Sequence, residues 1–337
     1  MIAIGSVEEY DLHDTGGWHP ERPARLQAVA HALDEFREAI VPLPRRSATA
    51  MEITRVHTPD YLEQLELITD AGGGGLDEET IVSPGSLATA KAAAGLGLAA
   101  IDALREGRAD AAFVGLRPPG HHARPRGGMG FCLLNNIAIA AAALADAGER
   151  VVIVDWDVHH GNGTQEMFWD DPRVLYVSTH QAASWPYTGA AAEVGGPHAR
   201  GDTVNVPLPA GASGDVGLRA FDDVVSEVVD QFNPTWVLIS AGYDAHRADP
   251  LADLAWSAGD FARLTKRVVA YAPGPGRTIA FLEGGYDLHA LRESVTATLG
   301  ALLDVPTTTE APTSGGPGMQ AVDTARRLRN DQLDVMA

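Results

Sequence analysis

The stretch between residues 151 and 165 places carboxylates and imidazoles directly after an apolar run. Residues 151–154 are Val-Val-Ile-Val, which predicts a buried parallel strand. Asp155, Asp157 and His159 follow it, and ligands of open α/β sheets bind outside the carboxyl ends of strands. Because Asp157 and His159 are two residues apart, their side chains point the same way in an extended chain and can hold one ion. Carboxylate oxygen and imidazole nitrogen suit Zn²⁺ or a similar divalent metal. Burying these groups without a metal or partner charges is costly, which favours a metal if they are buried. The alternative is a solvated loop with a hydrogen-bonded histidine.

Three more apolar runs end in residues of the same kinds. Each run has a strand pattern and is followed by glycine together with histidine, aspartate or tyrosine. The runs are 111–116 before His121 and His122, 236–239 before Asp244, and 278–282 before Tyr286. Strand ends that deliver these side chains to one edge of a sheet are what a single-metal hydrolase site needs.

Three of these side chains form the predicted metal site: Asp157, His159 and Asp244. A catalytic zinc keeps one position open for water and substrate, so three protein ligands suffice, and it lowers the pKa of a bound water towards ~7. One histidine of the His121–His122 pair would take the proton of that water and return it to the leaving amine. Tyr286 would donate to the tetrahedral oxyanion, although a core tyrosine at a helix start fits the same position.

The order of the predicted elements indicates the fold class. Strands alternate with helices from residue 151 onward, which predicts a three-layer α/β/α protein with a central, mainly parallel sheet. Residues 1–20 are expected to be irregular. The predicted strands are 111–116, 151–155, 173–178, 204–206, 235–240 and 278–282. The predicted helices are 21–38, 58–69, 86–106, 135–147, 215–231, 257–271 and 287–302.

The domain organisation follows from composition. Residues 1–305 are expected to form one catalytic domain, and residues 306–337 a flexible C-terminal tail. The segment 306–318 is rich in Thr, Pro, Gly and Ser, a composition typical of disorder. Residues 323–333 predict a short polar helix within that tail, with an oligomer contact as the alternative.

Charge and cysteine content exclude several classes of protein. The formal net charge of −20 disfavours nucleic-acid binding, which needs a basic face, and is compatible with a cationic substrate or with solubility alone. The single cysteine, Cys132, excludes an intrachain disulfide and a cysteine zinc cage. The first residues lack a basic signal-peptide region, and the longest apolar run, 137–145, is too short to span a bilayer. A cytoplasmic protein without a membrane partner is therefore expected.

Five motifs make the chain resemble the zinc-dependent histone deacetylase family over residues 13–303, most closely its class II and bacterial deacetylase-like amidohydrolases. They are Arg-Pro-Pro-Gly-His-His at 117–122, Gly-Phe-Cys-Leu-Leu-Asn-Asn at 130–136, Asp-Trp-Asp-Val-His-His-Gly-Asn-Gly-Thr-Gln at 155–165, Ser-Thr-His-Gln at 178–181 and Glu-Gly-Gly-Tyr at 283–286. Within these motifs, Asn162, Gln165 and Glu283 are the class II features.

The resemblance implies specific roles for these residues. His122 would be the general base and acid with Asn162 as its partner, and His121 would pair with Asp155. The implied walls of an acyl-lysine tunnel are Gly130, Phe131 and Trp185, with Tyr187 as the alternative to Trp185 and with Leu251 at the mouth. The resemblance also implies a structural K⁺ bound by backbone carbonyls of Asp155, Asp157 and His159 together with Ser178 and Thr179.

The expected function is a metal-dependent amidohydrolase that removes acetyl or similar acyl groups from acyl-lysine or related acylated amines. Zn²⁺ is the expected metal, with Fe²⁺ open, and a homo-oligomer is left open. An acetylpolyamine amidohydrolase and a catalytically silent acyl-lysine-binding module are the alternatives. A di-manganese ureohydrolase of the arginase type shares the implied fold, but Gly161 stands two residues beyond His159 and cannot ligate a second metal through a side chain.

Overall fold

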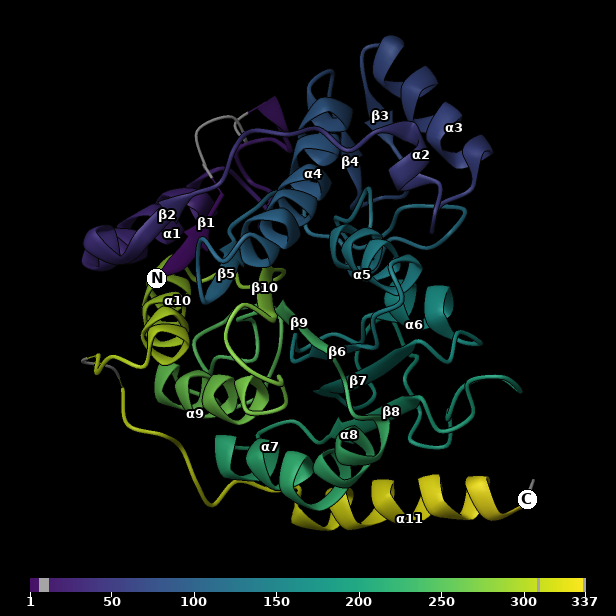
Figure 1. The fold of residues 1–337 in the computed structure, drawn as a ribbon, viewed down its shortest axis with the longest axis vertical. Coiled ribbons are helices and arrows are strands. Elements are labelled where there is room, and N and C mark those ends of the chain that lie inside the picture. The colour runs from purple at the N-terminus through teal and green to yellow at the C-terminus, as the bar shows by residue number, and fades with distance from the viewer. Residues whose placement is uncertain (6–11, 308–309, 336–337) are drawn as a thin grey trace.

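A single eight-stranded parallel sheet runs through the centre of the chain (Figure 1). The computed structural model describes residues 1–5, 12–307 and 310–335. Every strand pairing in this sheet is parallel. In spatial order the strands are β2 (Ile40–Pro42), β1 (Ile2–Ile4), β5 (Ala111–Val114), β10 (Thr278–Leu282), β9 (Trp236–Ala241), β6 (Val151–Asp155), β7 (Val174–Gln181) and β8 (Thr203–Leu208).

The six strands predicted from apolar runs are confirmed, whereas β1 and β2 were not predicted. Residues 2–4 were assigned to an irregular segment, but they form the fully buried strand β1. A strand of three residues is too short to show a period, so its pairing with β2 and β5 cannot be inferred locally. The expectation for residues 6–11 lies outside the described residues.

Helices cover both faces of the sheet, which confirms the predicted three-layer α/β/α architecture (Figure 1). The first face carries α4 (Ser86–Arg105), α5 (Asn136–Asp146) and α6 (Asn162–Phe168). The second carries α1 (Ala24–Leu33), α7 (Gly214–Ala220), α8 (Ser226–Phe232), α9 (Ala258–Val269) and α10 (Leu288–Leu303). The remaining elements are α2 (Ala50–Ile53), α3 (Pro59–Asp70), the 3₁₀ segment Asp34–Ala39, the π-helical turn Phe221–Val225 and the antiparallel pair β3 (Gly74–Gly75) and β4 (Ile81–Val82).

Burial on both faces explains why the central strands consist of apolar residues. All five residues of β6 and all six of β9 are buried, as in sheets covered by helices on both sides. Helix α4 is long and apolar enough to cross a membrane by length and composition, but 78% of its apolar window is buried inside the protein. We therefore treat α4 as a core helix.

The strand register brings the predicted functional residues to one level of the sheet. Asp155 at the end of β6 pairs with Ser178 of β7 on one side and with Ser240 of β9 on the other. Leu282 at the end of β10 pairs with Ala241. The segments that follow β6, β9 and β10 therefore leave the same edge side by side.

The C-terminal helix α11 (Met319–Val335) packs against β8 and α7, so the prediction of a flexible tail over 306–337 is wrong for this part of it. Val322 and Ala325 are buried in the contact. The Arg329 guanidinium donates to the carbonyl oxygens of Gly201 and Thr203 at 2.6 and 2.7 Å. The sequence signal was weak because the buried stripe contains few and small apolar residues. Residues 308–309 and 336–337 lie outside the described residues.

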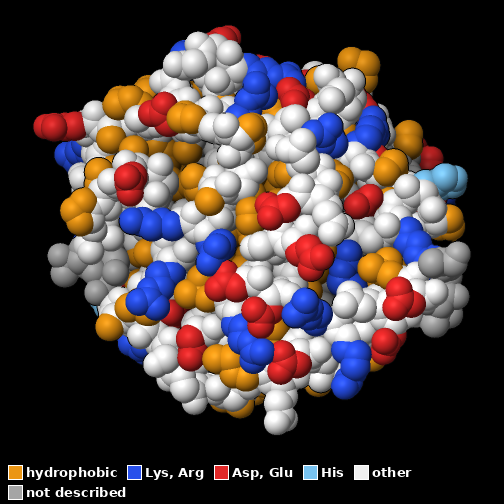
Figure 2. Space-filling view, turned by 60° about the horizontal axis from the view of Figure 1, so that its bottom comes forward, with side chains coloured by type: hydrophobic (Ala, Val, Ile, Leu, Met, Phe, Trp, Pro, Cys, Tyr) orange, Lys and Arg blue, Asp and Glu red, His pale blue; other side chains and the backbone are white. Residues whose placement is uncertain are grey.

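The face that carries α7, α8 and α11 has basic and acidic side chains interspersed (Figure 2). Several of them form ion pairs, such as Arg219 with Asp223 and with Asp323 at 2.8 and 2.6 Å. No large patch of one sign lies on this face.

Candidate active site

The three predicted metal ligands lie together at the carboxyl edge of the sheet. One ligand atom from each of Asp157, His159 and Asp244 can be chosen so that all three lie within 4.8 Å of one another. His159 Nδ1 is 3.3 Å from Asp157 Oδ1 and 3.2 Å from Asp244 Oδ2. The two carboxylates are buried and the imidazole is nearly so. Two oxygens and one nitrogen at this spacing fit a divalent metal with open positions.

Two glycines, which have no side chain, make room for the carboxylates of Asp157 and Asp244. A Cβ at Gly242 would lie 2.0 Å from Asp157 Oδ2, and a Cβ at Gly284 would lie 2.1 Å from Asp244 Oδ2. The amide of Gly284 donates to Asp157 Oδ2 at 2.8 Å, and the amide of Val158 donates to Asp244 Oδ1 at 2.9 Å. The backbone therefore approaches the carboxylates closely and orients them, which only glycine allows at these two positions.

The charges of the ligand trio do not balance in the metal-free protein. Burial, followed by the charge of Asp157, raises the pKa of Asp244 to about 7. Burial also acts to raise the pKa of Asp157, but the imidazoliums of His121 and His159 outweigh it and lower that pKa. Burial lowers the pKa of His159, and hydrogen bonds and charges of both carboxylates overcome this and raise it to about 10. The buried carboxylates of Asp157 and Asp244 are stabilised by a bound cation.

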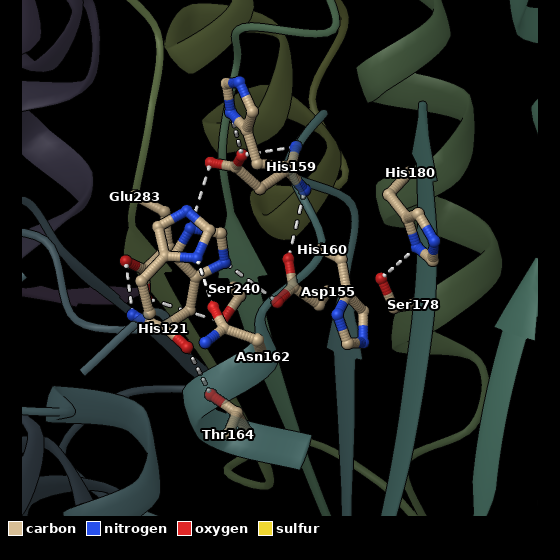
Figure 3. Close-up of polar contacts among 12 residues, drawn as sticks. His121, Asp155, His159, His160, Asn162, Thr164, Ser178, His180, Ser240 and Glu283 are labelled. Carbon is tan, nitrogen blue, oxygen red and sulfur yellow. Dashed lines mark hydrogen bonds and ion pairs between the residues drawn. The ribbon is translucent and has the colours of Figure 1, made fainter. Parts of the chain in front are cut away.

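The two predicted catalytic histidines have opposite electrostatic environments. His121 Nδ1 lies 3.0 Å from Asp155 Oδ2, a contact drawn in Figure 3. Burial acts to lower the pKa of His121, but the charges of Asp155, Asp157 and Glu283 together outweigh it and raise that pKa to about 10. His122 Nδ1 lies 2.9 Å from Asn162 Oδ1. Burial, together with the charges of His121 and His159, holds the pKa of His122 well below its ordinary value. These surroundings favour the imidazolium form of His121 and the neutral form of His122.

The loop that carries the histidine pair is held by Glu283, which the sequence analysis treated only as a class II feature. Its Oε2 accepts from the amides of Gly120 and His121 at 2.7 and 3.2 Å (Figure 3). Burial raises the pKa of Glu283 to about 7, opposed by the charge of His121. The contact joins residues 163 positions apart in the sequence, so no local pattern could have indicated it.

A cavity of about 360 Å³ leads from the surface to these residues. All four predicted tunnel residues line it, and so do His122, His159 and Tyr286. The complete lining is His19, Pro20, Glu78, Glu79, His122, Gly130, Phe131, His159, Trp185, Leu251 and Tyr286. Tyr187 is 78% exposed and is not part of the lining, so Trp185 and not Tyr187 forms the wall. The exposed Glu78 and Glu79 at the cavity were not predicted.

The tunnel walls depend on one glycine. A Cβ at Gly130, which has φ +55°, would lie 2.3 Å from the Trp185 ring and 2.7 Å from the His122 ring. The Trp185 ring stands edge-on to His122 with centroids 4.6 Å apart. A larger residue at position 130 would push the wall away from the base, so the tunnel cross-section is fixed by the absence of a side chain here.

The phenol of Tyr286 borders the same cavity. Its ring packs edge-on against Phe131 with centroids 5.8 Å apart, and the Arg25 guanidinium lies 5.0 Å from its centroid on another side. Burial, followed by the charge of Asp244, raises the pKa of Tyr286 well above its ordinary value. The hydroxyl therefore keeps its proton and can donate a hydrogen bond.

The turn that carries Tyr286 rests on a buried arginine that the sequence analysis did not single out. Arg25 Nε donates to the carbonyl of Gly285 at 2.7 Å, and its Nη2 donates to the carbonyl of Glu283. The Glu21 carboxylate bridges Arg25 and Arg117, and all three side chains are fully buried. Only the spacing of Glu21 and Arg25, four residues apart on one helical face, was a signal in the sequence.

The residues implied for a monovalent cation also lie together. Ser178 and Asp155 are paired by register, and Ser178 Oγ contacts His180 Nδ1 at 2.9 Å (Figure 3). Thr179 Oγ1 is buried and, within the part of the chain that the structure describes, has no hydrogen-bond partner. An oxygen in this position fits a cation ligand.

Comparisons with known proteins agree with this arrangement. The histone deacetylase domain model matches residues 19–302. A probable deacetylase of Archaeoglobus fulgidus is 41% identical over 292 residues, which cover 84% of this chain and 80% of that protein. A histone deacetylase-like amidohydrolase of Pseudomonas aeruginosa is 38% identical over 288 residues, with 80% and 75% covered. The crystal structure of the HDA15 HD domain superposes with a TM-score of 0.90 at 36% identity, covering 99% of this chain and 94% of that one. The chain belongs to the histone deacetylase family.

Proposed function

We propose that the protein is a metal-dependent amidohydrolase that removes acetyl or similar acyl groups from acyl-lysine or related acylated amines. One observation carries the proposal: Asp157, His159 and Asp244 form one cluster, and its member His159 lines a cavity whose wall also contains His122 and Tyr286. A ligand set, a neutral base and a protonated phenol are the groups that hydrolysis of an amide requires.

The metal is the group that the chain itself does not supply. Bound by Asp157, His159 and Asp244, a divalent metal would act as a Lewis acid towards the acyl carbonyl and lower the pKa of water. We propose Zn²⁺, with Fe²⁺ as the alternative. We also propose K⁺ near Ser178 and Thr179, supported by the unpartnered Thr179 hydroxyl.

The proton transfers follow from the histidine geometry. Asn162 Oδ1 accepts from His122 Nδ1, which leaves Nε2 of the neutral ring free to take a proton from the attacking water. The same Nε2 then gives the proton to the leaving amine. The neighbouring His121 imidazolium, held by Asp155, stabilises the negative charge that develops on the acyl oxygen. Tyr286 donates its hydroxyl proton in a hydrogen bond to the carbonyl oxygen as that oxygen becomes negative.

The alternative functions are less well supported. A silent acyl-lysine-binding module would need no proton-transfer residues, yet burial and the charges of His121 and His159 lower the pKa of His122, which favours the neutral form that a base requires. A di-metal ureohydrolase would need further carboxylate bridges, and the metal-binding cluster found among the described residues comprises three side chains only.

The decisive experiment is metal removal and return. Protein stripped by a chelator is expected to be inactive on an acetyl-lysine peptide, on acetylputrescine and on a small neutral acetamide. One equivalent of Zn²⁺ or Fe²⁺ per chain should restore turnover on at least one of them, measured by acetate release. Two tightly bound metals, full turnover after chelation, or no turnover with any substrate would contradict the proposal.

Substrate preference is expected to depend on Leu251, which lines the cavity and is 40% exposed. An apolar residue at this position offers nothing to a second ammonium group, and the diffuse attraction of the net charge of −20 is screened by salt beyond about 8 Å. We therefore expect a higher kcat/KM on the acetyl-lysine peptide than on acetylputrescine. Leu251→Glu should shift the ratio towards the polyamine, whereas Leu251→Gln, of similar size without charge, should not. A parent that prefers the polyamine would refute this expectation.

A further inference from the structure

A carboxylate outside the ligand trio joins the loop after β9 to the turn that carries Tyr286. The Asp249 side chain is 7% exposed. Its Oδ2 accepts from the amide of Tyr286 at 2.6 Å and from the amide of Asp287 at 3.4 Å. Its Oδ1 accepts from the amide of Leu251 at 3.0 Å. One side chain therefore contacts the backbone of both the tyrosine and the residue at the tunnel mouth.

The amide of Tyr286 needs such an acceptor. Tyr286 and Asp287 lie between the end of β10 at Leu282 and the start of α10 at Leu288, so their amides are not part of the strand pairing or of the helix. The Asp287 side chain caps α10 by accepting from the amide of Ala290 at 2.8 Å and does not serve Tyr286. An amide buried without an acceptor would be costly, so loss of Asp249 should force the turn to move.

The loop that holds Asp249 is itself fixed. The amide of Asp249 donates to the carbonyl of His246 at 2.9 Å, and His246 Nδ1 accepts from the amide of Ala248 at 3.1 Å. Glu310, from the segment before α11, accepts from His246 Nε2 at 2.8 Å and from Arg247 Nη2 at 2.6 Å. Asp249 thus lies in a loop that is held by its own hydrogen bonds and by Glu310. It can therefore fix the position of the amides that it binds.

A purely local role explains only part of this geometry. The bond from the amide of Leu251 to Oδ1 of Asp249 is a turn of the kind that aspartate often makes with the residue two positions on. The second oxygen is not needed for that turn, and it binds amides 37 and 38 residues away. The long-range contact is with the backbone of the turn that carries the Tyr286 phenol.

We propose that Asp249 is a positioning residue that aims the Tyr286 hydroxyl at the acyl oxygen by fixing the backbone of the turn. The inference rests on the proposed function in that Tyr286 must act on the substrate. It goes beyond that function because Asp249 is not one of the proposed metal ligands or cavity-lining residues and acts on the reaction through the turn that carries Tyr286.

The test begins with Asp249→Asn, which keeps the size but replaces one acceptor oxygen with an NH₂ group. The variant cannot serve Leu251 and Tyr286 together, so kcat on the acetyl-lysine peptide is expected to fall about 10- to 100-fold, since misplacement by about 1 Å can cost 10²-fold. KM and metal content should change little. The control is Asp253→Asn in the same loop, where the side chain is exposed and full turnover is expected.

A double-mutant cycle separates positioning from general damage. In a Tyr286→Phe background, Asp249→Asn should lower kcat by less than a further factor of about 3, because the residue acts through a hydroxyl that is already gone. Amide hydrogen exchange of residues 284–288, measured without substrate, should be faster in Asp249→Asn than in the parent. Asp249→Glu, which keeps both oxygens one methylene further out, serves as the second variant if the asparagine variant does not fold, and its kcat should also fall.

Parental kcat in Asp249→Asn, an equal loss in the Tyr286→Phe background, or a parallel loss of metal would overturn the inference. If the parent protein hydrolyses no acyl substrate, the proposed function fails. The exchange rates of residues 284–288 then still decide whether Asp249 fixes the turn.

Discussion

Asp244→Asn is expected to abolish metal binding and amide hydrolysis while leaving the fold intact. The change removes one of three ligand groups and one negative charge, but the amide oxygen can still accept from the amide of Val158. Elemental analysis should find less than one metal per chain, and turnover should fall to background. Asp253→Asn, in the same loop but exposed, should bind metal like the parent.

In chelator, the parent and the Asp244→Asn variant should differ in stability, and the pKa of Asp244 sets the direction of the difference. Burial and Asp157 raise the pKa of Asp244 to about 7, above the value of 3.8 expected in the unfolded chain. The native state then binds more protons than the unfolded state between these values, so the stability of the chelated parent falls as the pH rises through that window. Asp244→Asn lacks this group, and its Tm in chelator should exceed that of the parent by more at pH 8 than at pH 4. Retained metal, or a Tm difference that shrinks as pH rises, would contradict the assignment of Asp244.

Tyr286→Phe is expected to lower kcat by a factor on the order of 10²–10³, the cost of losing one donor to an oxyanion. Tyr286 lines the cavity together with His159 of the ligand trio, and its hydroxyl keeps its proton because burial raises its pKa. The ring contacts with Phe131 and Arg25 do not involve the hydroxyl, so folding and metal content should be unchanged. Steady-state kinetics on the acetyl-lysine peptide, with metal analysis of the same sample, measures both.

The matched control for this variant is Tyr187→Phe. Tyr187 is 78% exposed and lies outside the cavity lining, so removal of its hydroxyl should leave kcat and KM as they are. If Tyr286→Phe turned over at the parental rate, the phenol would have a structural role and the reaction would need another donor.

The residues that were predicted from sequence share one property: their position follows from local spacing and parallel topology. Asp157 and His159 are two residues apart after a strand, and Asp244 follows the neighbouring strand, so the sheet brings them together without any further information. The same reasoning placed His121 and His122 at the site. The family resemblance then supplied the tunnel residues Phe131 and Trp185.

The residues that were missed act through contacts between distant parts of the chain. Glu283 holds the histidine loop, Arg25 holds the tyrosine turn and Asp249 fixes its backbone, over separations of 163, 260 and 37 residues. Apart from the spacing of Glu21 and Arg25, no local pattern marks these residues, because each binds backbone atoms, which every residue has. Side-chain patterns reveal the groups that do chemistry, whereas the groups that orient them become visible only in the folded protein.

The contact between α11 and β8 has a consequence for the free edge of the sheet. β8 ends the sheet, and its inner edge is used by β7, as in the bond from the amide of Tyr176 to the carbonyl of Asp202. The carbonyls of Gly201 and Thr203 belong to the outer edge, where a strand from another molecule could add, and Arg329 binds both. The helix α11 therefore covers this edge and disfavours edge-to-edge association. A shortened chain ending near residue 305 would keep every catalytic group and lose that protection.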